Sequence, residues 1–331
     1  MPVERSGGAG VGGSGRESIR KPAVSIIGAG RLGCALALAL AGRGYRIEAV
    51  VARSVRHAKR AAKLIGTKPL ALASTQLIDL PRSDILFITT PDDHITEVAD
   101  ELAATIESRR KNNVKEAKDN RRVRTALHAS GALSSAALQS LREVGFATGS
   151  MHPLISVSNS VHGAESFGSA FFCVEGNATA VRVARELVRA LGAQSFSISA
   201  QDKALYHAAA VMASGHVTAL FDIAMEMLAR CGLTPRRARQ VLLPLLKSTL
   251  ENLRTTDPAH ALTGTFARAD TATVQRHLAA LRSAAQPDAL AAYQLLGKRS
   301  LRLAKAAGAR PDALEEIARE LGQQPRRGGR I

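Results

Sequence analysis

Three glycines near the start of the chain have the spacing Gly28-x-Gly30-x-x-Gly33, and a short apolar run precedes them. The first glycine permits a tight turn, the second lets the backbone approach a pyrophosphate, and the third allows a helix to pack closely on a strand. Amides at the start of that helix attract phosphate. We therefore predict a dinucleotide-binding loop, with a glycine-rich turn in an unrelated sheet as the alternative: Gly28, Ala29, Gly30, Arg31, Leu32 and Gly33.

The residues at the end of the second apolar run, 46–52, indicate whether the loop binds NAD or NADP. A site that prefers NAD usually presents a carboxylate there to the ribose 2′-hydroxyl. This chain has Arg53, Ser54 and Arg56 instead. Because a guanidinium binds phosphate in a bidentate way, we predict NADP(H) as the cofactor. The alternative is that both arginines are only exposed charges.

Two polar segments follow later strand-like runs, and loops after parallel strands face the ligand in an open sheet. Thr90, Pro91 and Asp92 form the first segment, and Ser130 with Gly131 forms the second. We predict that both line the cofactor. The alternatives are a helix cap for the first segment and a plain turn for the second.

Three side chains could exchange protons with a substrate. His152 follows another strand at the same edge, and an imidazole titrates near neutral pH. Lys203 and His207 are four residues apart, so they share one helix face with Ser214. A desolvated lysine has a lowered pKa that suits acid–base chemistry. The alternatives are a histidine bonded to a local carbonyl, a solvated lysine and a packed histidine.

Strand-like and helix-like segments alternate along the chain up to about residue 200. Only helical segments follow. This order predicts an α/β fold: a parallel Rossmann sheet covered on both faces, then an all-helical domain. Strands are expected at 23–28, 46–52, 84–90, 123–129, 146–151, 170–175 and 195–198. Helices are expected at 55–65, 93–105, 134–142, 178–191, 202–230, 235–253, 270–283, 287–307 and 311–321.

Composition excludes several classes of protein. Of 331 residues, 46% are hydrophobic, which is typical of a soluble globular protein. Three widely separated cysteines support neither a disulfide scaffold nor a zinc site, and no metal-ligand cluster is present in the sequence. Aromatic residues are only 3%, which argues against a base-stacking platform. We therefore expect a cytoplasmic protein.

Much of the net charge of +17 lies on appendages, so nucleic acid is not expected as the primary partner. A polyanion-binding role for the basic insertion is the weaker alternative. The first residues lack the apolar segment of a secretory signal, and no membrane association is expected. The predicted organisation is a tail at 1–22, a Rossmann domain at 23–199 with a basic insertion at about 107–122, a helical domain at 200–322 and a basic tail at 323–331.

Together the motifs resemble the Rossmann-like plus DUF2520 family of proteins described as NADP oxidoreductases. These are relatives of pyrroline-5-carboxylate reductase in the 6-phosphogluconate dehydrogenase-like superfamily. The resemblance covers about residues 22–285 and rests on segments 28–33, 90–93, 128–132, 149–154, 206–210 and 261–264. It implies a cofactor-binding domain, a helical dimerising domain like the C-terminal one of 6-phosphogluconate dehydrogenase, and a site in the cleft between them. The family supplies no established substrate, and the function we predict is NADP(H)-dependent hydride transfer to a small oxo or imino compound in that cleft, by a homodimer.

The resemblance also implies roles for single residues. In related hydroxyacid dehydrogenases a catalytic lysine precedes an asparagine by four residues, and Lys203 and His207 occupy those positions. Thr263 and Gly264 would lie near the substrate with Ser214. The chain departs from its relatives at Gly215, where they usually have asparagine. The alternative function is a dinucleotide-binding sensor or scaffold without turnover.

Overall fold

The computed structural model describes residues 20–112 and 123–322 and divides the chain into two compact units, residues 1–210 and 211–331. The predicted domain boundary near residue 200 precedes this division by about ten residues. Most of the predicted tails and of the basic insertion at 107–122 lies outside the described residues.

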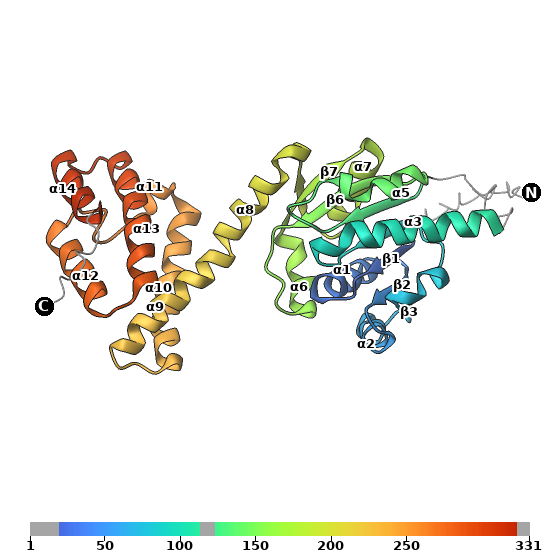
Figure 1. The fold of residues 1–331 in the computed structure, drawn as a ribbon, viewed down its shortest axis with the longest axis horizontal. Helices are drawn as coiled ribbons and strands as arrows, with labels where there is room; N and C mark the ends of the chain where they lie inside the picture. The colour runs from blue at the N-terminus through green and yellow to red at the C-terminus, as the bar shows by residue number, and fades with distance from the viewer. Residues whose placement is uncertain (1–19, 113–122, 323–331) are drawn as a thin grey trace, which may run out of the picture. The chain divides into compact units, whose positions relative to one another are not determined.

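The first unit is built on an eight-stranded sheet with the order β3-β2-β1-β4-β5-β6-β7-β8 (Figure 1). All neighbouring strands are parallel except β6 and β7. The strand order reverses between β1 and β4, and a crevice at such a point is where open α/β sheets bind ligands. The strands are β1 Val24–Ile27, β2 Ile47–Ala52, β3 Leu70–Ala73, β4 Ile85–Ile88, β5 Thr125–His128, β6 Ala147–Pro153, β7 Phe171–Gly176 and β8 Gln194–Phe196.

The sheet confirms the predicted fold class and differs from the prediction in two places. Strand β3 was not expected, because its sequence LALA has no β-branched residue and lies at the sheet edge, where Leu70 is exposed. Strand β7 runs antiparallel to β6, which the alternation of strands and helices did not indicate.

Helices cover both faces of the sheet. One face carries α1 Arg31–Gly42, α2 Val55–Ile65, α6 Ser160–Ser166 and α7 Ala178–Ala190. The other carries α3 Ile95–Asn112 and α5 Gln139–Glu143 with the 3-10 turns η1 Ser74–Asp79 and η3 Ser135–Leu138. Because both faces are covered, every residue of β1, β4 and β5 is buried. The helix expected at 134–142 is a 3-10 turn followed by one short helix.

The second unit is helical, as predicted. Its core lies among α12 Thr271–Ser283, α13 Pro287–Ala306 and α14 Pro311–Gly322. It also contains α9 Gly215–Arg230, α10 Pro235–Thr255 and α11 Pro258–Ala261. The single helix predicted at 202–230 is instead two helices, α8 Lys203–Ala213 and α9, because Ser214 has the non-helical angles φ −124° and ψ −71°.

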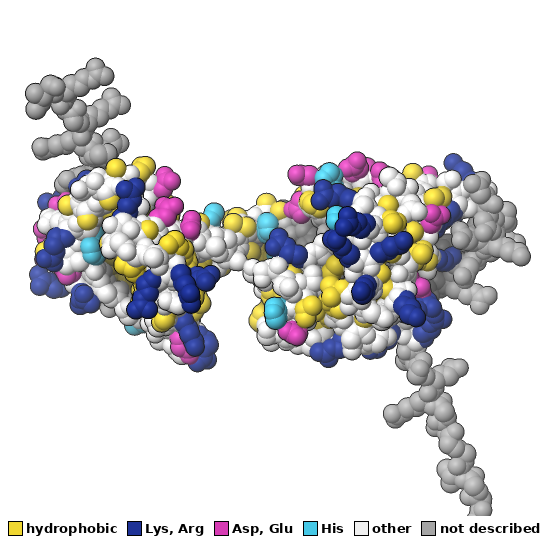
Figure 2. Space-filling view, turned by 90° about the horizontal axis from the view of Figure 1, so that it is seen from below, with side chains coloured by type: hydrophobic (Ala, Val, Ile, Leu, Met, Phe, Trp, Pro, Cys, Tyr) yellow, Lys and Arg dark blue, Asp and Glu magenta, His cyan; other side chains and the backbone are white. Residues whose placement is uncertain are grey.

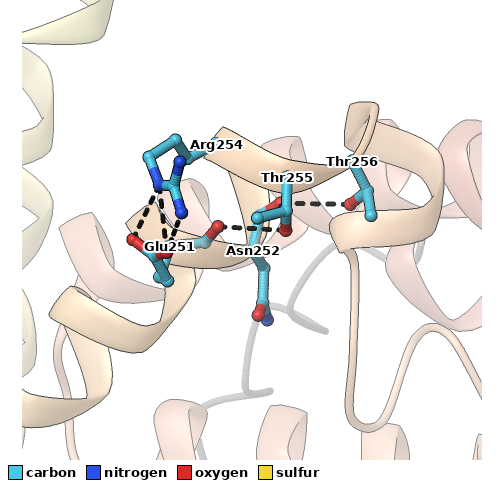
Figure 3. A network of polar contacts seen from close by, with 5 residues as sticks. All are labelled: Glu251, Asn252, Arg254, Thr255 and Thr256. Carbon is cyan, nitrogen blue, oxygen red and sulfur yellow. Dashed lines mark hydrogen bonds and ion pairs between the residues drawn. The ribbon is translucent and has the colours of Figure 1, made fainter.

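Polar contacts between residues close in sequence lie at the C-terminal end of helix α10 (Figure 3). The Arg254 guanidinium pairs with the Glu251 carboxylate at 2.6 Å, and the Thr255 and Thr256 hydroxyls each donate to the Asn252 carbonyl at 3.1 Å. The Asn252 carbonyl also accepts from the Thr256 amide at 2.9 Å, so the two hydroxyls add to a backbone hydrogen bond at the end of the helix. The Arg254–Glu251 pair is an exposed contact between side chains. The network is structural and shows no feature of a ligand site.

One helical stretch in the described part of the chain, residues 200–230, is long and apolar enough to cross a membrane by length and composition. Its charged residues Asp222 and Glu226 are exposed, and Lys203 near its start is buried within the first unit. None of the residues in its most apolar window is buried within the described structure.

Candidate functional site

The glycine loop joins β1 to α1 in the first unit. At each of its three glycines, a different steric feature of the structure favours a residue without a side chain. Gly28 has φ +104°, which only glycine adopts freely. A Cβ on Gly33 would lie 2.3 Å from the Gly28 carbonyl oxygen and 2.5 Å from Thr89 Oγ1. A Cβ on Gly30 would meet no atom within 4 Å, so the backbone is open there. The loop thus leaves room for a ligand directly before the amides of α1.

A cleft of about 1300 Å³ opens beside this loop. Its size exceeds the roughly 300–1,000 Å³ of ordinary small-molecule pockets, as a dinucleotide requires. The predicted residues that line it are Gly28, Ala29, Gly30, Arg53, Thr90 and Pro91. The predicted residues that do not line it are Arg31, Leu32, Gly33, Ser54, Arg56, Asp92, Ser130 and Gly131.

Two cationic side chains from the β2–α2 region line the cleft. Arg53 ends the loop after β2, and Arg60 lies on α2. The sequence-based prediction included Arg56 and missed Arg60, which lies one helical turn after Arg56 on α2. Ser54 is the N-cap of α2, where its hydroxyl accepts from the His57 amide. Two carboxylates, Glu97 and Glu101, line the α3 side, so the positive charge is confined to the β2–α2 side.

The loop after β4 contributes an orphan polar atom. Thr90 Oγ1 is buried and has no hydrogen-bond partner in the described structure. A buried hydroxyl without a partner costs free energy that a ligand oxygen would recover. Together with the open Gly30 backbone and the amides of α1, this hydroxyl fits a bound dinucleotide.

The loop after β5 is linked to the loop after β4. Ser130 Oγ donates to Asp92 Oδ2 at 2.7 Å and accepts from the amides of Ala132 and Leu133. The serine therefore shapes its own turn, as the alternative interpretation proposed, and also ties that turn to the segment that lines the cleft.

Beyond this link, three rings from two elements meet. His152 lies in β6, and Tyr206 and His207 lie in α8. His152 Nδ1 is 2.7 Å from the Tyr206 hydroxyl, and the rings of His152 and His207 pack edge to face with centroids 5.5 Å apart. A Cβ on Gly131 would lie 2.4 Å from His207 Cδ2, so only glycine lets the β5 loop approach these rings.

Burial determines the protonation of two of these groups. Desolvation, followed by the charge of Lys203, lowers the pKa of His152 to about 4. His152 is therefore neutral near pH 7, and the hydrogen bond between its Nδ1 and the Tyr206 hydroxyl joins two uncharged groups. Burial also raises the pKa of Tyr206, so the phenol keeps its proton.

Lys203 is the fully buried member of the group, with only 1% of its surface exposed. Its Nζ donates to the Ser130 carbonyl and to Ser150 Oγ, both at 3.1 Å. Ser150 Oγ in turn donates to Glu175 Oε2 at 3.3 Å. Desolvation lowers the pKa of Lys203, while nearby Cys173, Glu175 and Asp92 oppose that shift. The lysine therefore joins the loop after β5 to strand β6.

Sequence reasoning missed Glu175, Tyr206 and His128. The Glu175 carboxylate accepts from the Ser135 amide at 2.8 Å and hydroxyl at 2.7 Å, and its place at the end of a hydrophobic strand was the available signal. His128 is fully buried between the Ser130 amide, which donates to Nδ1, and the Ser134 carbonyl. Desolvation lowers its pKa to about 4, so it is a neutral support of the Ser130 turn.

The remaining predicted residues lie in the second unit and stay predictions. Ser214 separates α8 from α9, and its carbonyl accepts from the Thr218 amide. Thr263 and Gly264 lie in the loop after α11, where Gly264 has φ +81°. Within the described residues, no group of three or more His, Cys, Asp or Glu side chains could hold a metal ion.

Two family models match the sequence. The model of the Rossmann-like domain matches residues 12–153, and that of the domain of unknown function DUF2520 matches residues 170–300. No curated protein sequence matches the chain significantly.

Several solved structures share the fold. A Bacteroides fragilis protein named "putative NADP oxidoreductase" is 21% identical with a TM-score of 0.67, covering 86% of this chain and 100% of its own. An imine reductase from Myxococcus stipitatus in complex with NADP+ is 18% identical with a TM-score of 0.55, covering 89% and 99%. Pyrroline carboxylate reductase from Plasmodium falciparum with NADP bound is 13% identical with a TM-score of 0.54, covering 92% and 99%. The chain thus joins a Rossmann-like domain to a DUF2520 domain.

Proposed function

We propose that this protein is an NADP(H)-dependent oxidoreductase that reduces a small oxo or imino compound by hydride transfer. One observation carries the proposal: the Ser130–Asp92 hydrogen bond joins a dinucleotide-sized cleft to a cluster of proton-bearing side chains. The names of the structural neighbours, which include an imine reductase and a pyrroline carboxylate reductase, support the same reaction class.

The residues of the first unit would hold the cofactor as follows. Amides at the start of α1 would bind the pyrophosphate, Arg53 and Arg60 the 2′-phosphate, and Thr90 Oγ1 a ribose or amide group. The bound nicotinamide would supply the hydride, and the substrate heteroatom then requires a proton.

His207 and Tyr206 are the proposed source of that proton. Both are partly exposed, whereas Lys203 is enclosed. The neutral His152 ring orients the Tyr206 hydroxyl, and Lys203 holds the loops on which the cluster is built. Lys203 is therefore a positioning residue in this proposal, which refines the catalytic role that the resemblance implies.

The proposal is tested by following NADPH oxidation with a panel of cyclic imines and 2-oxo acids. Removal of a general acid typically lowers the rate by about 10²–10⁴-fold. We expect a loss of that order in His207→Ala or Tyr206→Phe with NADPH binding intact, and none in His162→Ala, which changes an exposed histidine on α6. NADPH binding without turnover on any substrate would instead favour the sensor, an alternative that Gly215 keeps open.

We also propose that the helical unit forms a homodimer. Large apolar side chains are exposed along α10, and Figure 2 shows hydrophobic side chains at the surface of this unit among Lys and Arg. The exposed residues of α10 are Val241, Leu243, Leu245, Leu250 and Leu253. Apolar surface of this extent is typical of an interface.

A further inference from the structure

A second cavity, of about 190 Å³, lies at the amino ends of β4, β5 and β6. Four arginines from three segments line it. Arg82 precedes β4, Arg109 and Arg110 end α3, and Arg124 precedes β5. The glycine loop and Thr90 lie at the carboxyl ends of the parallel strands, so this cavity opens at the other edge of the sheet.

Two of the guanidinium groups are held in place by the backbone. Arg109 Nη1 donates to the Leu80 carbonyl and Arg124 Nε to the Ser83 carbonyl, each at 2.7 Å. The Arg124 guanidinium also lies 4.5 Å from the centre of the Phe146 ring. A guanidinium has five N–H donors, so these contacts leave most of them for another acceptor.

Three of the four arginines are not matched by a carboxylate in an ion pair within the described residues. In residues 20–112 and 123–322, no ion pair joins Arg109, Arg110 or Arg124 to a carboxylate. Asp84 is close enough to act on Arg124, but one of its oxygens accepts from the Ala23 amide at 2.7 Å. Burial and the other three arginines lower the pKa of Arg124 to about 10, which shows that the cations repel one another.

Apart from Thr105, the other side chains of the wall are apolar. They include Leu86, Leu102, Ile106 and Phe146, and Phe146 is only 4% exposed. An inorganic anion bound only to the arginines would leave the apolar wall in contact with water. An anion that carries an organic group would cover this wall. The volume is well below the roughly 300–1,000 Å³ of ordinary ligand pockets, so a dinucleotide is too large.

We propose that this cavity binds a small organic phosphate monoester, with the phosphate against Arg109, Arg110 and Arg124 and the organic group against the apolar wall. A phosphate monoester carries about −1.5 to −2 charges near pH 7, which matches several guanidinium groups better than a single carboxylate does. Leu77 and Thr105 line both this cavity and the large cleft, so an occupant here would contact two residues that also face the cleft.

The test is calorimetric titration of the full chain with phenyl phosphate, inorganic phosphate and benzoate. We expect phenyl phosphate to bind most tightly, with and without NADPH present. Loss of a charge-assisted contact should weaken it by roughly ten- to a hundred-fold in Arg124→Gln. Arg110→Gln provides a second variant that changes an exposed side chain and spares the Arg124 contacts.

Two controls separate this cavity from other basic surfaces. Arg53→Gln combined with Arg60→Gln removes the cations of the cleft, and Arg189→Gln removes an exposed arginine of α7 on the opposite sheet face. With saturating NADPH present, so that the cofactor occupies the proposed 2′-phosphate site, both variants should keep the phenyl phosphate binding that Arg124→Gln weakens. The proposal is overturned by absence of binding, by equal affinity for inorganic phosphate or benzoate, or by loss in the Arg53/Arg60 variant alone. None of these readings depends on whether the protein oxidises NADPH.

Discussion

His128 and His152 show how burial alone sets the charge of single residues in this protein. Both are held neutral by the surrounding structure, and each uses a ring nitrogen to position a neighbour. In the unfolded chain the same rings take up a proton near pH 6.5. Protonation therefore favours unfolding, and the sign of the pH dependence follows.

We expect the free energy of unfolding to fall as the pH drops from 6.5 towards 4, because the unfolded state binds more protons in that window. Each histidine contributes up to roughly 3 kcal/mol, from about 1.36 kcal/mol per pKa unit. Urea unfolding across this range measures the slope. A His128→Gln variant should have a shallower slope and His162→Gln the wild-type one; identical slopes in all three proteins would refute the assignment.

Arg53 and Arg60 are the proposed contacts to the 2′-phosphate, and a second prediction for single residues follows from them. Arg53→Asp places a carboxylate where NAD-specific sites have one, so it should weaken NADPH binding far more than NADH binding. The loss of a charge-assisted contact is about 1.5–3 kcal/mol, or roughly ten- to a hundred-fold. Arg56→Asp, three residues later on α2 and outside the lining of the cleft, is the matched control. An unchanged ratio of the NADPH and NADH dissociation constants in Arg53→Asp would contradict this role.

The glycines of the β1–α1 loop are expected to differ in how they tolerate an added methyl group. Gly33→Ala would place a methyl group 2.3 Å from the Gly28 carbonyl oxygen, so it should destabilise the fold and abolish cofactor binding. Gly30→Ala meets no protein atom, so it should keep wild-type stability and still weaken NADPH binding, because the methyl group occupies the space for the pyrophosphate. Thermal unfolding and NADPH titration of both variants measure the two effects; equal stability losses would show that the loop has no specific opening at Gly30.

Elements differ in how far the sequence predicts them. Buried parallel strands are continuous apolar runs, and β1, β4 and β5 were predicted for that reason. Edge strand β3 lacks this signal, and the direction of β7 depends on its pairing with β6. Glu175 and Tyr206 reach the cluster from β7 and α8, so only tertiary structure brings them to Ser150 and His152.

At the scale of the whole molecule, the exposed apolar residues of α10 predict association. Light scattering should give twice the chain mass of 34.9 kDa. Leu245→Glu should shift the protein towards the monomer, because Leu245 is 63% exposed and its replacement places a charge in the interface. Lys247→Glu, a neighbouring change without loss of apolar surface, is the control. Flotation of the wild-type protein with lipid vesicles, or a monomeric wild type, would contradict the dimer.

The most direct test of the account is calorimetric titration of the purified full chain with NADPH and with NADH. The account predicts one NADPH per chain and weaker binding of NADH, since Arg53 and Arg60 would contact only the 2′-phosphate. Absence of measurable binding by both cofactors would contradict the central claim that the first unit holds a dinucleotide.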